Sequence, residues 1–153
     1  MCCGVEPKAG VHFTKVTPTR SSPELADFLK MIAKHYPEAQ TIHLVMDNLS
    51  SHKRKALVDR FGPEEGGRLW ERFTVHYTPI HGSWLNQAEI EISLFSRQCL
   101  GKRRIGDLQS LRTEARAWNR QVNRKRVRIN WTFNRKTARR KFKYKYKTKR
   151  SQT

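Results

Sequence analysis

The sequence predicts an α/β fold with a mixed sheet flanked by helices. Short apolar runs rich in β-branched residues alternate with longer segments whose apolar residues recur every three or four positions. The first pattern is typical of strands and the second of amphipathic helices, in the order strand, helix, strand, helix, strand, helix, helix. A chain of 153 residues is long enough for one domain with a hydrophobic core.

Caps, chain breakers and apolar spacing define the individual elements. An apolar stub, a Pro–Gly turn and an alternating segment predict an N-terminal hairpin whose first strand is cut short. Ser, Asn or Asp at the capping position, or Pro in the first turn, marks the helix starts. The expected strands are 2–5, 11–16, 41–46 and 73–77, with 129–133 as a last extended segment. The expected helices are 22–36, a second from 51 or 52 to about 61 with Ser50 or Ser51 as its cap, 63–72, 84–97, 108–122 and 135–146.

The charge of the chain is unevenly distributed. Residues 115–153 contain 16 Lys and Arg and no Asp or Glu, whereas residues 1–114 contain 16 Lys and Arg against 13 Asp and Glu. A cationic block of this kind is typical of proteins that bind a polyanion, most often nucleic acid. The alternative is a solvated basic tail without a specific partner.

Aromatic residues interleave with the cations of this block, which suits contact with a nucleic-acid backbone or a single strand. We expect Trp131 and Phe133 to pack on the core and 147–153 to form a disordered basic tail. The cations of the last helix and tail that are candidate DNA contacts are Arg139, Arg140, Lys141, Lys143 and Lys145.

Cysteine usage and hydropathy argue against several classes of protein. Cys2, Cys3 and Cys99 lack the spacing of zinc ligands, and their odd number favours reduced thiols in a cytosolic protein. The first residues lack the features of a signal peptide, and no segment approaches the ~18 apolar residues of a membrane span. These observations predict a cytoplasmic protein with no membrane partner.

Two carboxylates are candidate metal ligands. Asp47 follows the apolar run 42–46, so it lies at the C-terminal edge of the predicted sheet, where ligand sites form in open α/β folds. Glu89 lies in the second turn of the predicted helix 84–97. A strand-end Asp and a helical Glu can converge on a divalent cation and support phosphoryl transfer on a nucleic acid. The simpler interpretation is an Asp that caps a loop and a solvated Glu.

Polar residues flank both carboxylates. Asn48 can fix the Asp47 loop or contact a phosphate, and His52 can support a metal ligand or only hydrogen-bond within the loop. Trp84 can stack on a base or close its loop as a core residue. The candidate DNA contacts in this second segment are His81, Ser83, Trp84 and Asn86.

Two longer motifs resemble a known family. Val45-Met46-Asp47-Asn48-Leu49-Ser50-Ser51-His52 resembles the second-aspartate motif of mariner-type DDE transposases, in their bacterial insertion-sequence branch. Residues 76–91 resemble the segment that carries the catalytic glutamate of the same enzymes. The resemblance extends from Val5 to about Tyr146. It implies a ribonuclease H-like catalytic domain over residues 1–146 that acts on transposon ends and target DNA.

In that family, Asp47 and Glu89 would be the second and third members of an Asp-Asp-Glu triad that binds two Mg²⁺ or Mn²⁺ ions. The first Asp of the triad lies upstream of the hairpin, so the resemblance implies an N-terminally truncated domain whose first strand is absent. Neither Glu6 nor Asp27 matches the missing position.

Three hypotheses follow from the resemblance. The chain is the C-terminal portion of a transposase catalytic domain and is inactive alone. Alternatively, it is the downstream half of a split enzyme, completed by an upstream half or a second copy. The third hypothesis is a non-catalytic protein that binds DNA through its basic tail.

Overall fold

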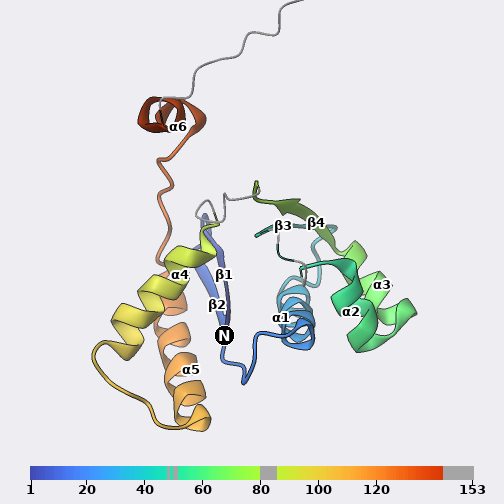
Figure 1. The fold of residues 1–153 in the computed structure, drawn as a ribbon, viewed down its shortest axis with the longest axis horizontal. Helices are drawn as coiled ribbons and strands as arrows, with labels where there is room; N and C mark the ends of the chain where they lie inside the picture. Colours follow the sequence, from blue (N-terminus) through green and yellow to red (C-terminus); the bar gives the residue numbers. More distant parts are fainter. Residues whose placement is uncertain (48, 50–51, 80–85, 143–153) are drawn as a thin grey trace, which may run out of the picture.

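The computed structural model describes residues 1–47, 49, 52–79 and 86–142 (Figure 1). Within these residues the chain has a mixed α/β architecture of four strands and six α-helices. The predictions for Asn48, Ser50, Ser51, His81, Ser83, Trp84, Lys143 and Lys145, and for the tail 147–153, lie outside the described residues.

The strands form two separate two-stranded sheets. β1 (Cys2–Glu6) pairs antiparallel with β2 (Val11–Lys15), and β3 (Ile42–Met46) pairs in parallel with β4 (Phe73–Tyr77). The prediction of one mixed sheet is therefore wrong for the described residues, because no strand among them joins the two pairs. β1 and β2 are paired over their full and equal lengths, so the first strand is not shorter than the second.

Most helices agree with the sequence pattern. The described helices are α1 (Ser22–His35), α2 (Arg54–Phe61), α3 (Pro63–Glu71), α4 (Ala88–Phe95) with a π-helical continuation (Ser96–Leu100), α5 (Leu108–Lys125) and α6 (Arg135–Phe142). Two of them begin later than expected: α2 at Arg54 and α4 at Ala88. The expected extended segment 129–133 is not a strand.

Helix α1 is central to the first hydrophobic core. Its residues Phe28, Leu29 and Ile32 lie on one face and are at most 5 % exposed. They pack with side chains of β2, α2 and β4, so α1 contacts apolar residues from both sheets. In Figure 1, α1 lies between the β1–β2 hairpin and the pair α2 and α3. The helix thus holds the two sheets in one structure although their strands do not pair.

The second core attaches α4, its π-helical continuation and α5 to the hairpin. Phe95 at the end of α4 and Trp118 of α5 meet edge to face with ring centroids 5.3 Å apart. Val16, Cys99, Ala115 and Val122 complete this core. Asp107 begins α5 by accepting a hydrogen bond from the Ser110 backbone N–H at 2.8 Å, as expected for an N-cap.

The segment between α5 and α6 differs from the prediction. Trp131 and Phe133 contact one another edge to face, with centroids 6.2 Å apart, instead of entering either core. Trp131 is 38 % exposed. Asn134 caps α6 through a hydrogen bond from the Thr137 backbone N–H at 2.9 Å, as predicted.

The three cysteines are free thiols. Burial raises the pKa of Cys3 to about 12, so this thiol stays protonated at neutral pH. Across the described part of the chain, every helix is too short or too polar to span a lipid bilayer.

Candidate active-site edge

The parallel pair β3 and β4 places Asp47 at a sheet edge. Met46 is opposite Tyr77 in the register, and the Thr78 N–H donates to the Met46 carbonyl oxygen at 2.9 Å. The two strands therefore end together, and Asp47 follows directly on β3. The next described element in the chain after β4 is α4, which carries Glu89. Carboxyl ends of parallel strands are the usual place for ligand sites in such sheets.

His52 lies against the Asp47 carboxylate. Its Nδ1 is 2.5 Å from Asp47 Oδ1 and 3.1 Å from the Asp47 carbonyl oxygen. The Tyr77 hydroxyl donates to the His52 carbonyl oxygen at 2.6 Å, which ties this loop to the end of β4. Both members of the pair are only partly exposed, Asp47 at 26 % and His52 at 21 %. The imidazole can therefore orient the carboxylate, a role often played by groups behind a metal ligand.

Glu89 is exposed in the first turn of α4, one turn earlier in its helix than expected. Asn86 holds the start of this helix, since its Oδ1 accepts from the Ala88 N–H at 3.1 Å and its carbonyl oxygen accepts from the Glu89 N–H at 3.1 Å. Asn86, predicted to contact DNA, thus has a capping role in the fold.

The carboxylates of Asp47 and Glu89 are the right type of ligand for a hard divalent cation, but the site has too few of them. Carboxylate oxygens such as those of Asp47 and Glu89 are the ligands that Mg²⁺ prefers. Among the described residues, however, no group of three or more His, Cys, Asp or Glu side chains lies close enough to hold a metal ion. Glu89 therefore does not complete a three-member cluster with Asp47 and His52. These residues alone do not form a metal site.

Neither Glu6 nor Asp27 supplies the missing ligand. Asp27 accepts hydrogen bonds from Arg60, with Nε at 3.0 Å from Oδ1, and this contact lowers the pKa of Asp27. Glu6 accepts from the Tyr36 hydroxyl at 2.6 Å. Both carboxylates are committed to structural contacts.

A buried ionisable pair escaped the sequence prediction. His12 Nδ1 lies 2.8 Å from Glu91 Oε2, and the two side chains are 1 % and 0 % exposed. His12 Nε2 also lies 2.9 Å from the Val127 carbonyl oxygen. Glu91 has isoleucine on both sides in the sequence, and an acid inside an apolar helical segment was the one available signal. The pair joins β2, α4 and the segment after α5. We therefore assign it a structural role and do not include it in the candidate site at the Asp47 edge.

The predicted DNA contacts on α6 are only partly described. Arg139, Arg140 and Lys141 are exposed in the last turns of the helix. This arrangement leaves a dense positive charge on a short helix whose sequence contains no acid, which is favourable for contact with a polyanion.

A family model for DDE superfamily endonucleases matches residues 1–112, from β1 to the first turns of α5. The matched residues include Asp47 and Glu89. No curated protein and no solved structure matches the chain. Members of this superfamily act on DNA and typically use divalent metal ions. Because the match covers more than half of its length, the chain belongs to the DDE superfamily endonucleases.

Proposed function

We propose that this chain carries two of the three carboxylates of a transposase active site, of the mariner type found in bacterial insertion sequences. Asp47 and Glu89 are the two carboxylates, and the third comes from outside residues 1–153. The observation that carries the proposal is the position of Asp47 at the carboxyl edge of a parallel strand pair, with its carboxylate oriented by His52 at 2.5 Å.

The unpaired edge of β3 is where we place the strand that would carry the third carboxylate. Within the described chain, β3 pairs only with β4 and so keeps one edge unpaired. Val45 on β3 is also 54 % exposed. Two-stranded sheets are marginally stable alone, and an open edge readily accepts a further strand. A parallel strand on this edge of β3 would place a residue at its carboxyl end beside Asp47. The strand would belong to an upstream polypeptide or to a second copy of the chain.

Each group has a distinct role in the completed site. Asp47 and Glu89 would hold Mg²⁺ or Mn²⁺, two ions in the complete site, which supply Lewis-acid activation to phosphodiester chemistry. His52 would keep the Asp47 carboxylate in a fixed orientation. The residues proposed to hold the DNA are His81, Ser83 and Trp84, which precede Glu89 in the sequence, and Arg139, Arg140, Lys141, Lys143 and Lys145 near the C-terminal end of the sequence.

Strand cleavage of a transposon-end duplex with Mn²⁺ tests this function. The chain alone is expected to be inactive, because two carboxylates leave the metal site incomplete. Co-expression with the polypeptide encoded immediately upstream is expected to restore cleavage. Asp47→Ala and Glu89→Ala should each lower this restored rate by at least about 10³-fold, as expected when an essential catalytic group is removed.

A matched control is Asp59→Ala. Asp59 is an exposed carboxylate on α2 that pairs with Lys55 one turn away, and its replacement should leave the restored rate unchanged. Two results would contradict the proposal. Cleavage by the chain alone that is lost in Asp47→Ala would show that no further carboxylate is needed. Restored cleavage that survives Asp47→Ala would remove this residue from the site.

A non-catalytic DNA-binding function is the second candidate. It is favoured by the lack of a three-member metal cluster in the described residues and by the acid-free sequence after Glu114. It predicts salt-sensitive DNA binding that survives Asp47→Ala and Glu89→Ala, and no cleavage with any upstream polypeptide. The co-expression assay therefore separates the two functions.

A further inference from the structure

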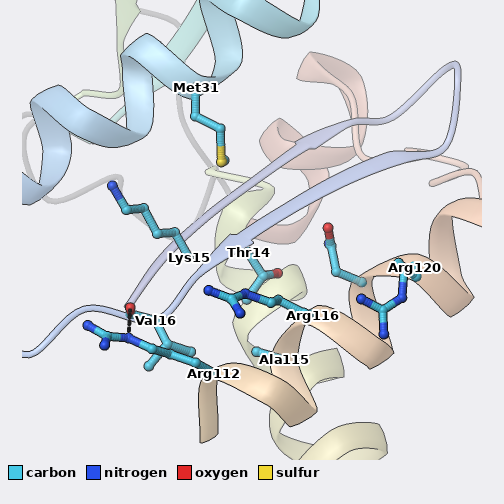
Figure 2. Close-up of a pocket in the computed structure, with 9 residues that line it drawn as sticks. Thr14, Lys15, Val16, Met31, Arg112, Ala115, Arg116 and Arg120 are labelled. Carbon is cyan, nitrogen blue, oxygen red and sulfur yellow. Dashed lines mark hydrogen bonds between the residues drawn. The ribbon is translucent and has the colours of Figure 1, made fainter. Parts of the chain in front are cut away.

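A cationic pocket lies between the β1–β2 hairpin and α5 (Figure 2). None of its lining residues belongs to the Asp47 edge. Its cavity has a volume of about 510 Å³. Four of the lining residues are Lys or Arg and none is Asp or Glu. The lining residues are Thr14, Lys15 and Val16 of the hairpin and its end, Met31 of α1, and Arg112, Ala115, Arg116, Asn119 and Arg120 of α5.

Three arginines follow each other along one side of α5. Arg112, Arg116 and Arg120 are spaced four residues apart, so their Cα atoms rise by about 6 Å per step along the helix axis. The Arg112 Nε–H donates to the Val16 carbonyl oxygen at 3.4 Å, which fixes this guanidinium at one end of the pocket. Figure 2 shows the three side chains arranged along α5, with Lys15 coming from the hairpin.

The positive charge of this arginine row is not neutralised by nearby acids. Among the described residues, no carboxylate forms an ion pair with Arg112, Arg116 or Arg120. The acid on α5, Glu114, instead pairs with Arg103 at 2.9 Å.

Lys15, unlike the three arginines, forms an ion pair with a carboxylate, since its Nζ lies 3.6 Å from Asp27 Oδ2. The guanidinium groups therefore carry most of the attraction for an anion. No side chain of residues 115–153 can occupy the pocket as an anion, because this segment contains no Asp or Glu.

We propose that the pocket binds the phosphodiester backbone of DNA, as a contact separate from the basic C-terminal segment. Guanidinium groups bind phosphate through paired N–H donors, and a linear row of them suits a ligand whose negative charges repeat along a strand. The cavity is larger than one phosphate requires and lies within the usual range of ligand pockets. The inference rests on the proposed function only in taking DNA as the polyanion.

Fluorescence anisotropy with a labelled DNA duplex tests the proposal on the full chain. EDTA is present, so that binding is measured without any metal-dependent cleavage. The variant R112Q/R116Q/R120Q removes the row, and glutamine has nearly the helix propensity of arginine. Between about 50 and 200 mM salt, we expect the negative slope of log K against log salt to become shallower by roughly 2–3. At the lower salt concentration the Kd should rise at least about tenfold.

The control variant K53Q/K55Q/R68Q removes the same charge from exposed positions on and beside α2 and α3. It should change Kd by less than about threefold, since loss of net charge alone acts weakly at a distance in salt. Equal losses from the two triple variants, or no loss from the pocket variant, would overturn the proposal.

Two further measurements complete the test. The single variant Arg116→Gln changes one exposed side chain and should reduce the salt slope by about 1, so the result does not depend on the triple variant alone. Inorganic phosphate at constant ionic strength should not displace the duplex. Displacement that weakens wild-type binding to the level of the triple variant would identify a small-anion site instead. Intact DNA binding together with no cleavage in the co-expression assay would count only against the proposed active site.

Discussion

Replacing Glu91 with alanine is expected to lower the free energy of unfolding by about 3 kcal/mol, because it leaves a buried hydrogen-bonding group without its partner and a cavity in place of the side chain. Glu91 and His12 are fully buried, with Nδ1 and Oε2 2.8 Å apart. The same imidazole contacts the Val127 carbonyl oxygen at 2.9 Å. Without the carboxylate, His12 Nδ1 would stay buried without a partner, and α4 would lose its polar link to β2.

Glu89→Ala is the matched control for this prediction. Glu89 lies two residues earlier on the same helix and is exposed, so its replacement should change stability by no more than about 0.5 kcal/mol. Urea unfolding followed by circular dichroism measures both variants. Similar losses for Glu89→Ala and Glu91→Ala would show that the buried pair contributes little and that α4 is simply sensitive to substitution.

The same pair predicts a pH dependence of stability. Burial raises the pKa of Glu91 above its ordinary value of 4.5, although the hydrogen bond from His12 acts in the opposite direction. Above pH 4.5 the unfolded chain releases a proton that the folded chain still holds, so stability falls as the pH rises from 4.5 through the folded-state pKa. Cys3, the neighbouring titratable thiol, has a pKa of about 12 and stays protonated in this range.

The free energy of unfolding of the wild type and of Glu91→Gln, measured from pH 4 to pH 8, checks this direction. The stability of the wild type relative to Glu91→Gln should decrease as the pH rises, because glutamine does not titrate. A difference that stays constant over this range, or that increases, would contradict the raised pKa.

The individual helices and strands were predictable from the sequence, because caps, prolines and apolar spacing lie within each element. Ser21 and Pro23 mark the start of α1, and its apolar spacing identifies the buried face. Sheet connectivity was not predictable in the same way. Whether β1 and β3 belong to one sheet depends on which strands are available beside them, and no pattern within residues 2–6 or 42–46 encodes that.

The contacts of the candidate site were likewise predictable only where they join residues that are close in the sequence. Asp47 at the end of β3 follows from a strand pattern, and its contact with His52 joins residues only five apart in the sequence. The His12–Glu91 pair joins residues 79 apart, so neither position shows its partner. The arginine row on α5 could have been found, because a repeat of four residues marks one side of a helix. It was masked by the general abundance of cations in this part of the chain.

Gly66→Ala is expected to destabilise the protein by about 3 kcal/mol or more, at the high end of the cost of overpacking. A Cβ at Gly66 would lie 2.6 Å from the Leu57 carbonyl carbon and 2.7 Å from the Val58 nitrogen, and would also collide with the Leu57 carbonyl oxygen. These are backbone atoms of α2, so no change of rotamer relieves the contact. The two helices would have to separate over Leu57, which is 0 % exposed.

Gly67→Ala provides the comparison, because the two glycines are adjacent in α3. A Cβ at Gly67 would meet the end of the flexible Arg54 side chain, with Nη2 at 2.9 Å. That side chain can move, and alanine is favoured over glycine inside a helix by about 1 kcal/mol. Thermal unfolding followed by circular dichroism should therefore show a Tm about 10 °C lower for Gly66→Ala, but little change or a small increase for Gly67→Ala.

The close approach of α2 and α3 also bears on the candidate site. Helix α3 leads into β4, and the Arg72 carbonyl oxygen between them accepts from the Ile42 N–H at the start of β3 at 2.8 Å. If α3 moves away from α2, the alignment of β3 and β4, and with it the position of Asp47, should loosen as well. Equal Tm values for Gly66→Ala and Gly67→Ala would mean that the helices separate at little cost. The position of Asp47 would then depend on pairing within the sheet alone.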